Sequence, residues 1–246
     1  MTASLLYFSR FKMAHSSHQL AFPAPRTWGG RRAGAGRKPA PGRRPGVAHA
    51  TRPPHHAGHP VHVTIRTGPG IRCLRAARVF PAIRGALAAS SHGGFRVVHF
   101  TVQDDHLHLI VEADDRATLA RSLRGLAIRV ARAVNGALGR RGAVCTDRYH
   151  ARALTSPRAV RHALIYVLMN RRKHCAEERG LDPCSSAPWF DGWRNAVAPL
   201  TGRPPVVRAC TWLATVGWHR HGLIDADTEY PRRRHVGRET RYRSSP

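Results

Sequence analysis

Negative charge is scarce in this sequence. Its 246 residues include 41 Lys and Arg but only 14 Asp and Glu, which gives a formal net charge of +27. No acidic residue occurs before Asp104, whereas 16 basic residues do. A surface of this sign attracts polyanions, and nucleic acid is the most abundant polyanion in a cell. The composition therefore favours a nucleic-acid partner.

Long apolar runs and paired cysteines are also missing. No apolar run reaches the ~18 residues that a membrane-spanning helix needs, and residues 5–12 lead into no apolar core of a signal peptide. The five cysteines are dispersed and none stands in a Cys-x-x-Cys pair: Cys73, Cys145, Cys175, Cys184 and Cys210. This pattern fits neither a disulfide framework nor a zinc ribbon. We therefore expect reduced thiols in a cytoplasmic protein with no membrane partner.

Composition divides the chain into three parts. Residues 1–58 are rich in Gly, Pro, Arg and His, which predicts a disordered basic arm. The arm has two interpretations, a segment that follows DNA phosphates or a solvated tail with no role beyond its charge. Residues 59–176 carry regular hydrophobic patterns and form the predicted folded domain. Residues 177–246 form a C-terminal extension, predicted as a small helical addition with an arginine-rich tail.

The patterned region predicts alternating strands and helices. Alternation and β-branched residues predict strands at residues 62–67, 95–102, 106–112 and 144–154. Helical spacing of apolar residues predicts helices at residues 76–89, 118–138 and 156–174, with a further short helix at 206–218. Asp104 and Asp105 form too short a connection for anything but an antiparallel hairpin. The order β-α-β-β-α-β-α predicts an α+β fold, an antiparallel sheet with helices on one face.

The third predicted strand carries His106 and His108. Residues two apart on a strand project from the same face, so the two imidazoles lie side by side. Two imidazoles at this separation can bind one divalent metal ion. With 17 histidines in the chain, a chance pair of surface or hydrogen-bonded histidines is the alternative.

The helix predicted at residues 156–174 carries Tyr166 and Asn170, one turn apart on the same side. His162 and His174 extend this polar stripe at the rim of the core. A packing role for the tyrosine is the simpler interpretation of the helix alone. Together with the histidine pair, the helix predicts a metal held by two imidazoles and an amide oxygen, with a phenol nearby. Tyrosine can act as a covalent nucleophile, and its ordinary pKa near ~10 means that it needs activation.

These elements together resemble the HUH-type single-tyrosine transposases, in particular the single-strand insertion-sequence and REP-associated tyrosine transposase group. The resemblance covers residues 61–176, about half the chain, and rests on four segments: His62-Val-Thr-Ile-Arg66, residues 98–110 around His-Leu-His, Asp147-Arg-Tyr-His150, and Tyr166-Val-Leu-Met-Asn170. A His-Leu-His strand followed about 60 residues later by a Tyr-x-x-x-Asn helix is fairly specific, whereas either half alone is weak.

The resemblance implies a ferredoxin-like sheet and a set of roles. His106, His108 and Asn170 would bind Mg²⁺ or Mn²⁺, and Tyr166 would attack single-stranded, hairpin-forming DNA to give a 5′-phosphotyrosine and a free 3′-hydroxyl. The reverse attack would rejoin the strand. Related enzymes include monomers and homodimers, so the oligomeric state stays open. Basic residues near the motifs are the candidates for contacts to the DNA backbone: Arg66, Arg148, His150, Arg171, Arg172 and Lys173.

The sequence also departs from the pattern of the family and leaves alternatives open. The helix runs on as Arg-Arg-Lys-His after Asn170, where REP-related members often continue with Pro-Val-Arg or a similar sequence. The four C-terminal tryptophans are either base-stacking residues or, as we favour, the core of a small cap: Trp189, Trp193, Trp212 and Trp218. A catalytically inactive, transposase-derived DNA-binding protein is the alternative function, and an HUH endonuclease of replication or conjugal transfer is a third.

Overall fold

The computed structural model describes residues 54–145, 147–174, 180–195 and 202–229, and the side chains of Lys173 and His174 are outside this description. All of these residues belong to one of the two compact units of the chain, Gly46–Pro246, and only this unit is considered. The basic arm at residues 1–58 therefore lies almost wholly outside the described residues, as do Cys175 and the arginine-rich tail.

The sheet has four strands in the order β2-β3-β1-β4, and each neighbouring pair is antiparallel. The strands are β1 (Val61–Arg66), β2 (Phe95–Val102), β3 (His106–Ala113) and β4 (His150–Ala153). With β1 and β3 in the centre and a β-α-β-β-α-β order, this is the ferredoxin-like arrangement. The α+β fold class and the hairpin between the second and third strands are thus confirmed.

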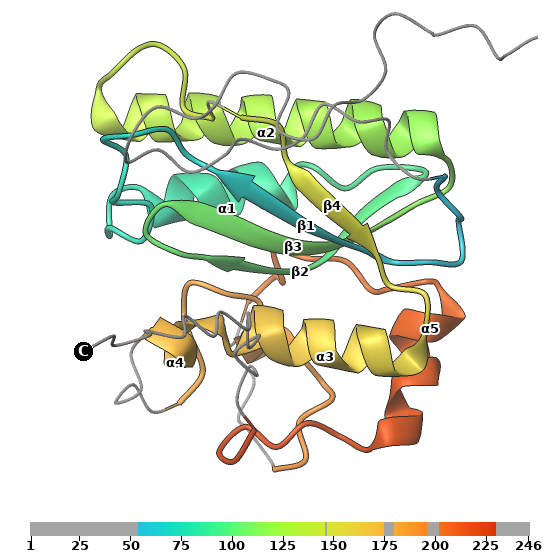
Figure 1. Ribbon diagram of the computed structural model, residues 1–246. Helices are drawn as coiled ribbons and strands as arrows, with labels where there is room; N and C mark the ends of the chain where they lie inside the picture. Colours follow the sequence, from blue (N-terminus) through green and yellow to red (C-terminus); the bar gives the residue numbers. More distant parts are fainter. Residues whose placement is uncertain (1–53, 146, 175–179, 196–201, 230–246) are drawn as a thin grey trace, which may run out of the picture. The chain divides into compact units, whose positions relative to one another are not determined.

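Two helices cover one face of this sheet, α1 (Phe80–Ala88) and α2 (Arg116–Leu138). They lie side by side against it in Figure 1. Alternate residues of the central strands meet their apolar stripes in one core that includes Val63, Leu109 and Leu126, all fully buried. Asp115 caps α2 by accepting a hydrogen bond from the Thr118 amide, and Gly139, with φ 62°, ends it.

The third helix lies on the opposite face, which corrects the expectation that all helices share one face. The helix α3 (Pro157–Leu168) packs on β2 and β3 (Figure 1). Its apolar side is buried with Ile110 of β3 and with the C-terminal residues, in a second core. Ser156 caps it by accepting from the Ala159 amide, and Pro157 occupies its first turn. The helix lies on this face because the C-terminal segment supplies apolar residues that bury the apolar side of α3.

The predicted helices and strands are mostly present but shorter than expected. The helix predicted at 156–174 is interrupted at Met169, so that α4 (Asn170–His174) is a separate short turn. The strand predicted at 144–154 is reduced to β4. The helix predicted at 206–218 is replaced by α5 (Trp212–Thr215) and the 3₁₀ turn η2 (Gly217–His221), while η1 (Ala187–Trp189) was not expected.

The C-terminal tryptophans divide into two kinds. Trp193 and Trp218 are buried in the core around α3, as the cap interpretation predicts. Trp212 is 48% exposed, and the guanidinium of Arg220 lies 4.9 Å from its ring centroid. None of the four described cysteines, Cys73, Cys145, Cys184 and Cys210, is in a disulfide among the described residues. Within the described residues no helix is long and apolar enough to cross a membrane.

Candidate functional site

The site is built on the face of β3 that looks toward α3. His106 and His108 both project from this face, because Leu107 between them is buried in the opposite core. Their ring centroids are 4.8 Å apart at an interplanar angle of 87°. His108 is buried and His106 is half-buried. The predicted pairing of the two imidazoles is therefore present.

A carboxylate holds the ring of His106. Its Nδ1 lies 2.5 Å from Oδ1 of Asp105, the neighbouring residue in the chain. Burial opposes ionisation of Asp105, but the hydrogen bond and the charge of His106 outweigh it, so the pKa of Asp105 is lowered. An ionised carboxylate only accepts hydrogen bonds, so Nδ1 of His106 donates its proton to Asp105. Histidines that bind metals are oriented by carboxylate partners in this way.

The ring of His108 is fixed at both nitrogens. Its Nδ1 lies 3.0 Å from Oγ1 of Thr64 and 3.3 Å from Nε2 of His62. Its Nε2 lies 3.5 Å from the hydroxyl oxygen of Tyr166. The pairing of β1 with β3 brings this about, since Thr64 is directly opposite His108. As in His106, Nδ1 of His108 contacts other groups of the protein, and its Nε2 is on the side of Tyr166.

His62 belongs to this cluster, although the sequence analysis did not select it as a site residue. Its ring centroid lies 5.3 Å from that of His108 and 5.5 Å from that of Tyr166. Burial, together with the charges of His150 and Arg152 on β4, lowers the pKa of His62 to about 4. The imidazole is therefore neutral at neutral pH. Only its position on the segment His62–Arg66 gave a sequence signal, because its contacts depend on how β1 pairs.

Asn170 lies where α3 ends. It is completely buried, and neither its amide oxygen nor its amide nitrogen has a hydrogen-bond partner among the described atoms. The next residue, Arg171, lies 3.7 Å from Asp104, which precedes β3. The end of α3 therefore lies near the start of β3. Tyr166 lies beside His108, and Asn170, one turn later, is on the side of His106. A buried amide oxygen without a partner is an unusual group that a bound ligand would satisfy.

These groups fit a divalent ion. The candidate donors are Nε2 of His106, Nε2 of His108, which also lies 3.5 Å from the Tyr166 hydroxyl, and the amide oxygen of Asn170, which has no hydrogen-bond partner among the described atoms. Imidazole and amide donors suit several first-row divalent ions. Within the described ranges no cluster of three or more His, Cys, Asp or Glu forms a metal site, so the third protein ligand would have to come from a residue such as Asn170.

The predicted DNA-binding residues fall into two groups. Arg66, Arg148 and His150 are exposed, at or next to the strands β1 and β4. Arg171 lies beside Asp104, and Arg172 donates to the backbone carbonyls of Ala226 and Gly180. The side chain of Lys173 is outside the described residues. His162, which extends the polar stripe of α3, is exposed.

Solved structures that are similar to this chain include two transposases. No family model and no curated protein matches the sequence. A REP-associated tyrosine transposase bound to a REP hairpin has 15% identity and a TM-score of 0.48, covering 64% of this chain and 93% of the other. A candidate transposase from Deinococcus radiodurans R1 has 17% identity and a TM-score of 0.31, covering 47% and 85%.

The solved structures thus include the group that the sequence motifs resemble.

Proposed function

We propose that the protein is a transposase that cleaves and rejoins single-stranded DNA through a 5′-phosphotyrosine intermediate. One observation carries the proposal: the hydroxyl of Tyr166 lies 3.5 Å from Nε2 of His108, within a cluster of oriented histidines. A tyrosine with a packing role alone would not need its hydroxyl directed at a buried imidazole. The alternative, a DNA-binding protein without catalysis, would need no such arrangement.

Tyr166 would act as the nucleophile. Its phenolic oxygen forms a bond to phosphorus, the bond between phosphorus and the 3′ oxygen breaks, and a 5′-phosphotyrosine remains. The phenolic proton passes to solvent, and the departing 3′ oxygen takes up a proton from solvent. Attack by a 3′-hydroxyl reverses the step, so that rejoining consumes no external energy source.

His106, His108 and Asn170 would hold a divalent metal, Mg²⁺ or Mn²⁺. When bound, such an ion neutralises charge on a phosphodiester and lowers the barrier to attack. The protein's own contribution is orientation: Asp105 fixes the ring of His106, while Thr64 and His62 fix the ring of His108. The low pKa of His62 keeps one positive charge out of the cluster.

The DNA strand would lie over β1 and β4. The helix α3 packs mainly on β2 and β3, and its Tyr166 lies beside His62 of β1. Arg66, His150 and Arg152 are exposed on these two strands, and the exposed Arg148 precedes β4. Arginines placed in this way bind backbone phosphates irrespective of sequence. Hairpin-forming DNA is the expected substrate because the sequence motifs resemble enzymes of that kind.

A denaturing-gel assay with end-labelled single-stranded hairpin oligonucleotides tests the proposal. We expect a retarded, protein-linked band with Mg²⁺ or Mn²⁺ and none with EDTA. Tyr166→Phe should abolish the adduct yet leave DNA affinity near that of the wild type, whereas the matched Tyr149→Phe variant should retain the adduct. Cleavage by Tyr166→Phe would exclude this nucleophile. Salt-sensitive binding without an adduct across a broad oligonucleotide pool would establish the non-catalytic alternative.

A further inference from the structure

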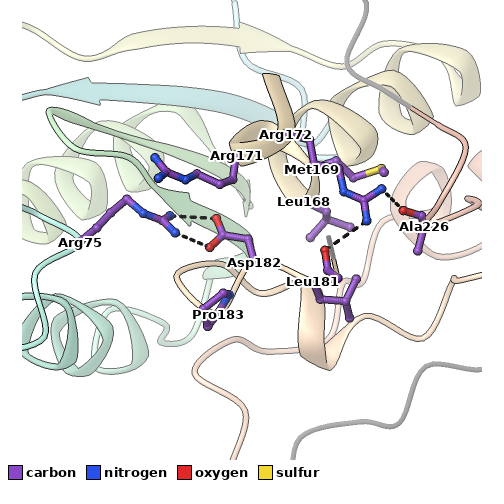
Figure 2. Close-up of a pocket in the computed structure, with 10 residues that line it drawn as sticks. Arg75, Leu168, Met169, Arg171, Arg172, Leu181, Asp182, Pro183 and Ala226 are labelled. Carbon is purple, nitrogen blue, oxygen red and sulfur yellow. Dashed lines mark hydrogen bonds and ion pairs between the residues drawn. The ribbon is translucent and has the colours of Figure 1, made fainter. Parts of the chain in front are cut away.

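A cavity of about 270 Å³ lies at the carboxyl end of α3. Arg75, Arg171 and Arg172 line it, and Figure 2 shows Arg75 paired with Asp182 on one side and Arg172 directed toward Ala226 on the other. Leu168, Met169, Leu181 and Pro183 give it apolar walls. The C-terminal extension forms part of its wall, with residues 180–183 and Ala226. These residues lie outside the stretch that carries the family motifs. The cavity is therefore a feature of this chain's own extension.

The charges around this cavity are unbalanced toward positive. Arg75 makes a bidentate pair with Asp182, at 2.7 and 2.9 Å, and its third contact is to the carbonyl of Val102. Asp182 is buried and also accepts from the Cys184 amide, so this carboxylate is fully used. The guanidinium of Arg172 contacts only carbonyl oxygens among the described residues, those of Ala226 and Gly180. Three guanidinium groups and one carboxylate thus line the cavity, and Arg171 lies in addition 3.7 Å from Asp104.

Fixed guanidinium groups beside apolar walls suit a ligand with an anionic group and a flat ring. Guanidinium planes bind phosphate and stack on aromatic rings. Pockets for drug-sized molecules measure roughly 300–1,000 Å³, so a cavity of about 270 Å³ has room for a single base with its phosphate but not for a duplex. One nucleotide has both properties and this size.

The cavity adjoins the proposed active site through β3. Arg171 lies 3.7 Å from Asp104, and Asp105, the next residue, holds the ring of His106. Met169, which lines the cavity, precedes Asn170. A strand whose phosphate lies at Tyr166 would therefore have its neighbouring nucleotides within reach of the cavity.

We infer that the cavity holds one unpaired nucleotide of the DNA strand, a step or two from the phosphate that Tyr166 attacks. The inference rests on the proposed function for the identity of the strand. The arginines would bind its phosphate, and the leucine, methionine and proline walls would contact its base. The C-terminal extension would thus contribute to substrate selection, in addition to covering α3.

Binding measured with Tyr166→Phe protein tests the inference separately from cleavage. Oligonucleotides carrying one abasic position at a time, across four nucleotides on each side of the cleaved bond, are titrated by fluorescence anisotropy. If no cleaved bond exists, the abasic position is moved along the whole oligonucleotide. We expect one position at which loss of the base weakens binding about tenfold. A second substitution, Leu181→Trp, fills the cavity. It should weaken binding of the intact strand by a similar factor, and removal of the base should then have no further effect on binding.

Leu223→Trp is the matched control, because Leu223 is 38% exposed and does not line the cavity. It should leave the abasic profile unchanged, and a thermal melt of both variants verifies folding. A flat profile for the parent protein, or a penalty that persists with Leu181→Trp, would overturn the inference. So would displacement of the strand by micromolar free deoxynucleoside monophosphate, which would make the cavity a site for a free nucleotide. If wild-type protein forms no covalent adduct while the binding of Tyr166→Phe protein still depends on one base position, only the proposed function is refuted.

Discussion

The hydroxyl of Tyr166 and Nε2 of His108 are 3.5 Å apart, although 58 residues separate them along the chain. The distance depends on two independent placements. Strand β3 lies in the centre of the sheet and shows His108 to one face, and α3 packs on that same face with Tyr166 at its edge. Since α1 and α2 cover the other face, the site forms where only one helix covers the sheet.

Asp105→Asn should weaken metal binding about 10- to 100-fold, because loss of a carboxylate that orients a ligand histidine has effects of this size. Asp105 is the group that hydrogen-bonds Nδ1 of His106. Titration with Mn²⁺, followed by water-proton relaxation, measures the affinity without any DNA. The control is Asp104→Asn, which removes the same charge one residue away and should change the affinity by less than threefold. Equal losses in the two variants would contradict an orienting role.

Acid should destabilise the protein through His99. Burial lowers the pKa of His99 to about 4, against the opposing charges of Asp191 and Glu112. The unfolded chain takes up this proton near pH 6.5 and the folded chain only near pH 4, so stability is lost as the pH falls between these values. His99→Gln should reduce the loss of unfolding free energy between pH 6.5 and pH 4, by up to roughly 3 kcal/mol. Urea unfolding at pH 7, 5.5 and 4 measures the effect, and parallel curves for the two proteins would refute it.

Glu112→Gln should loosen the C-terminal extension. Glu112 is buried on β3, and its carboxylate accepts from the amides of Cys210 and Thr211 and from the Thr211 hydroxyl. An amide side chain loses charge and places a donor against donors, which we expect to cost about 1–3 kcal/mol of unfolding free energy. Limited proteolysis should cut near residue 210 faster. Asp114→Asn, an exposed change on the same stretch of chain, should leave both readouts unchanged.

Two glycine substitutions should act in opposite directions. A Cβ at Gly192 would lie 2.4 Å from ring carbons of Phe190 and of Trp218. Gly192→Ala should therefore lower the unfolding free energy by about 1–3 kcal/mol, as overpacking does. Gly85, inside α1, has open space at the same position, so Gly85→Ala should raise stability by about 0.4–1 kcal/mol. Thermal melts of the two variants decide the matter, and equal shifts would show that Gly192 tolerates a side chain.

The sequence by itself predicted the elements and their order. Alternation at His62–Thr67 and at His106–Glu112 predicted two strands that became β1 and β3, and the stripe from Leu119 to Val134 predicted α2. These signals are local, because strand and helix periods place one face of each element in a core. The spacing of His106 with His108, and of Tyr166 with Asn170, is local in the same way.

Tertiary structure decided what those local pairs meet. His62 joined the cluster because β1 pairs with β3 in a register that sets Thr64 opposite His108, and no short-range pattern specifies that register. The C-terminal segment decided on which face α3 lies, since its buried residues, Trp193 and Trp218 among them, supply the second core. The same segment closes the arginine cavity with Leu181 and Asp182. Contacts between residues so distant in the chain arise only when the cores are packed, so hydrophobic patterning alone could not locate them.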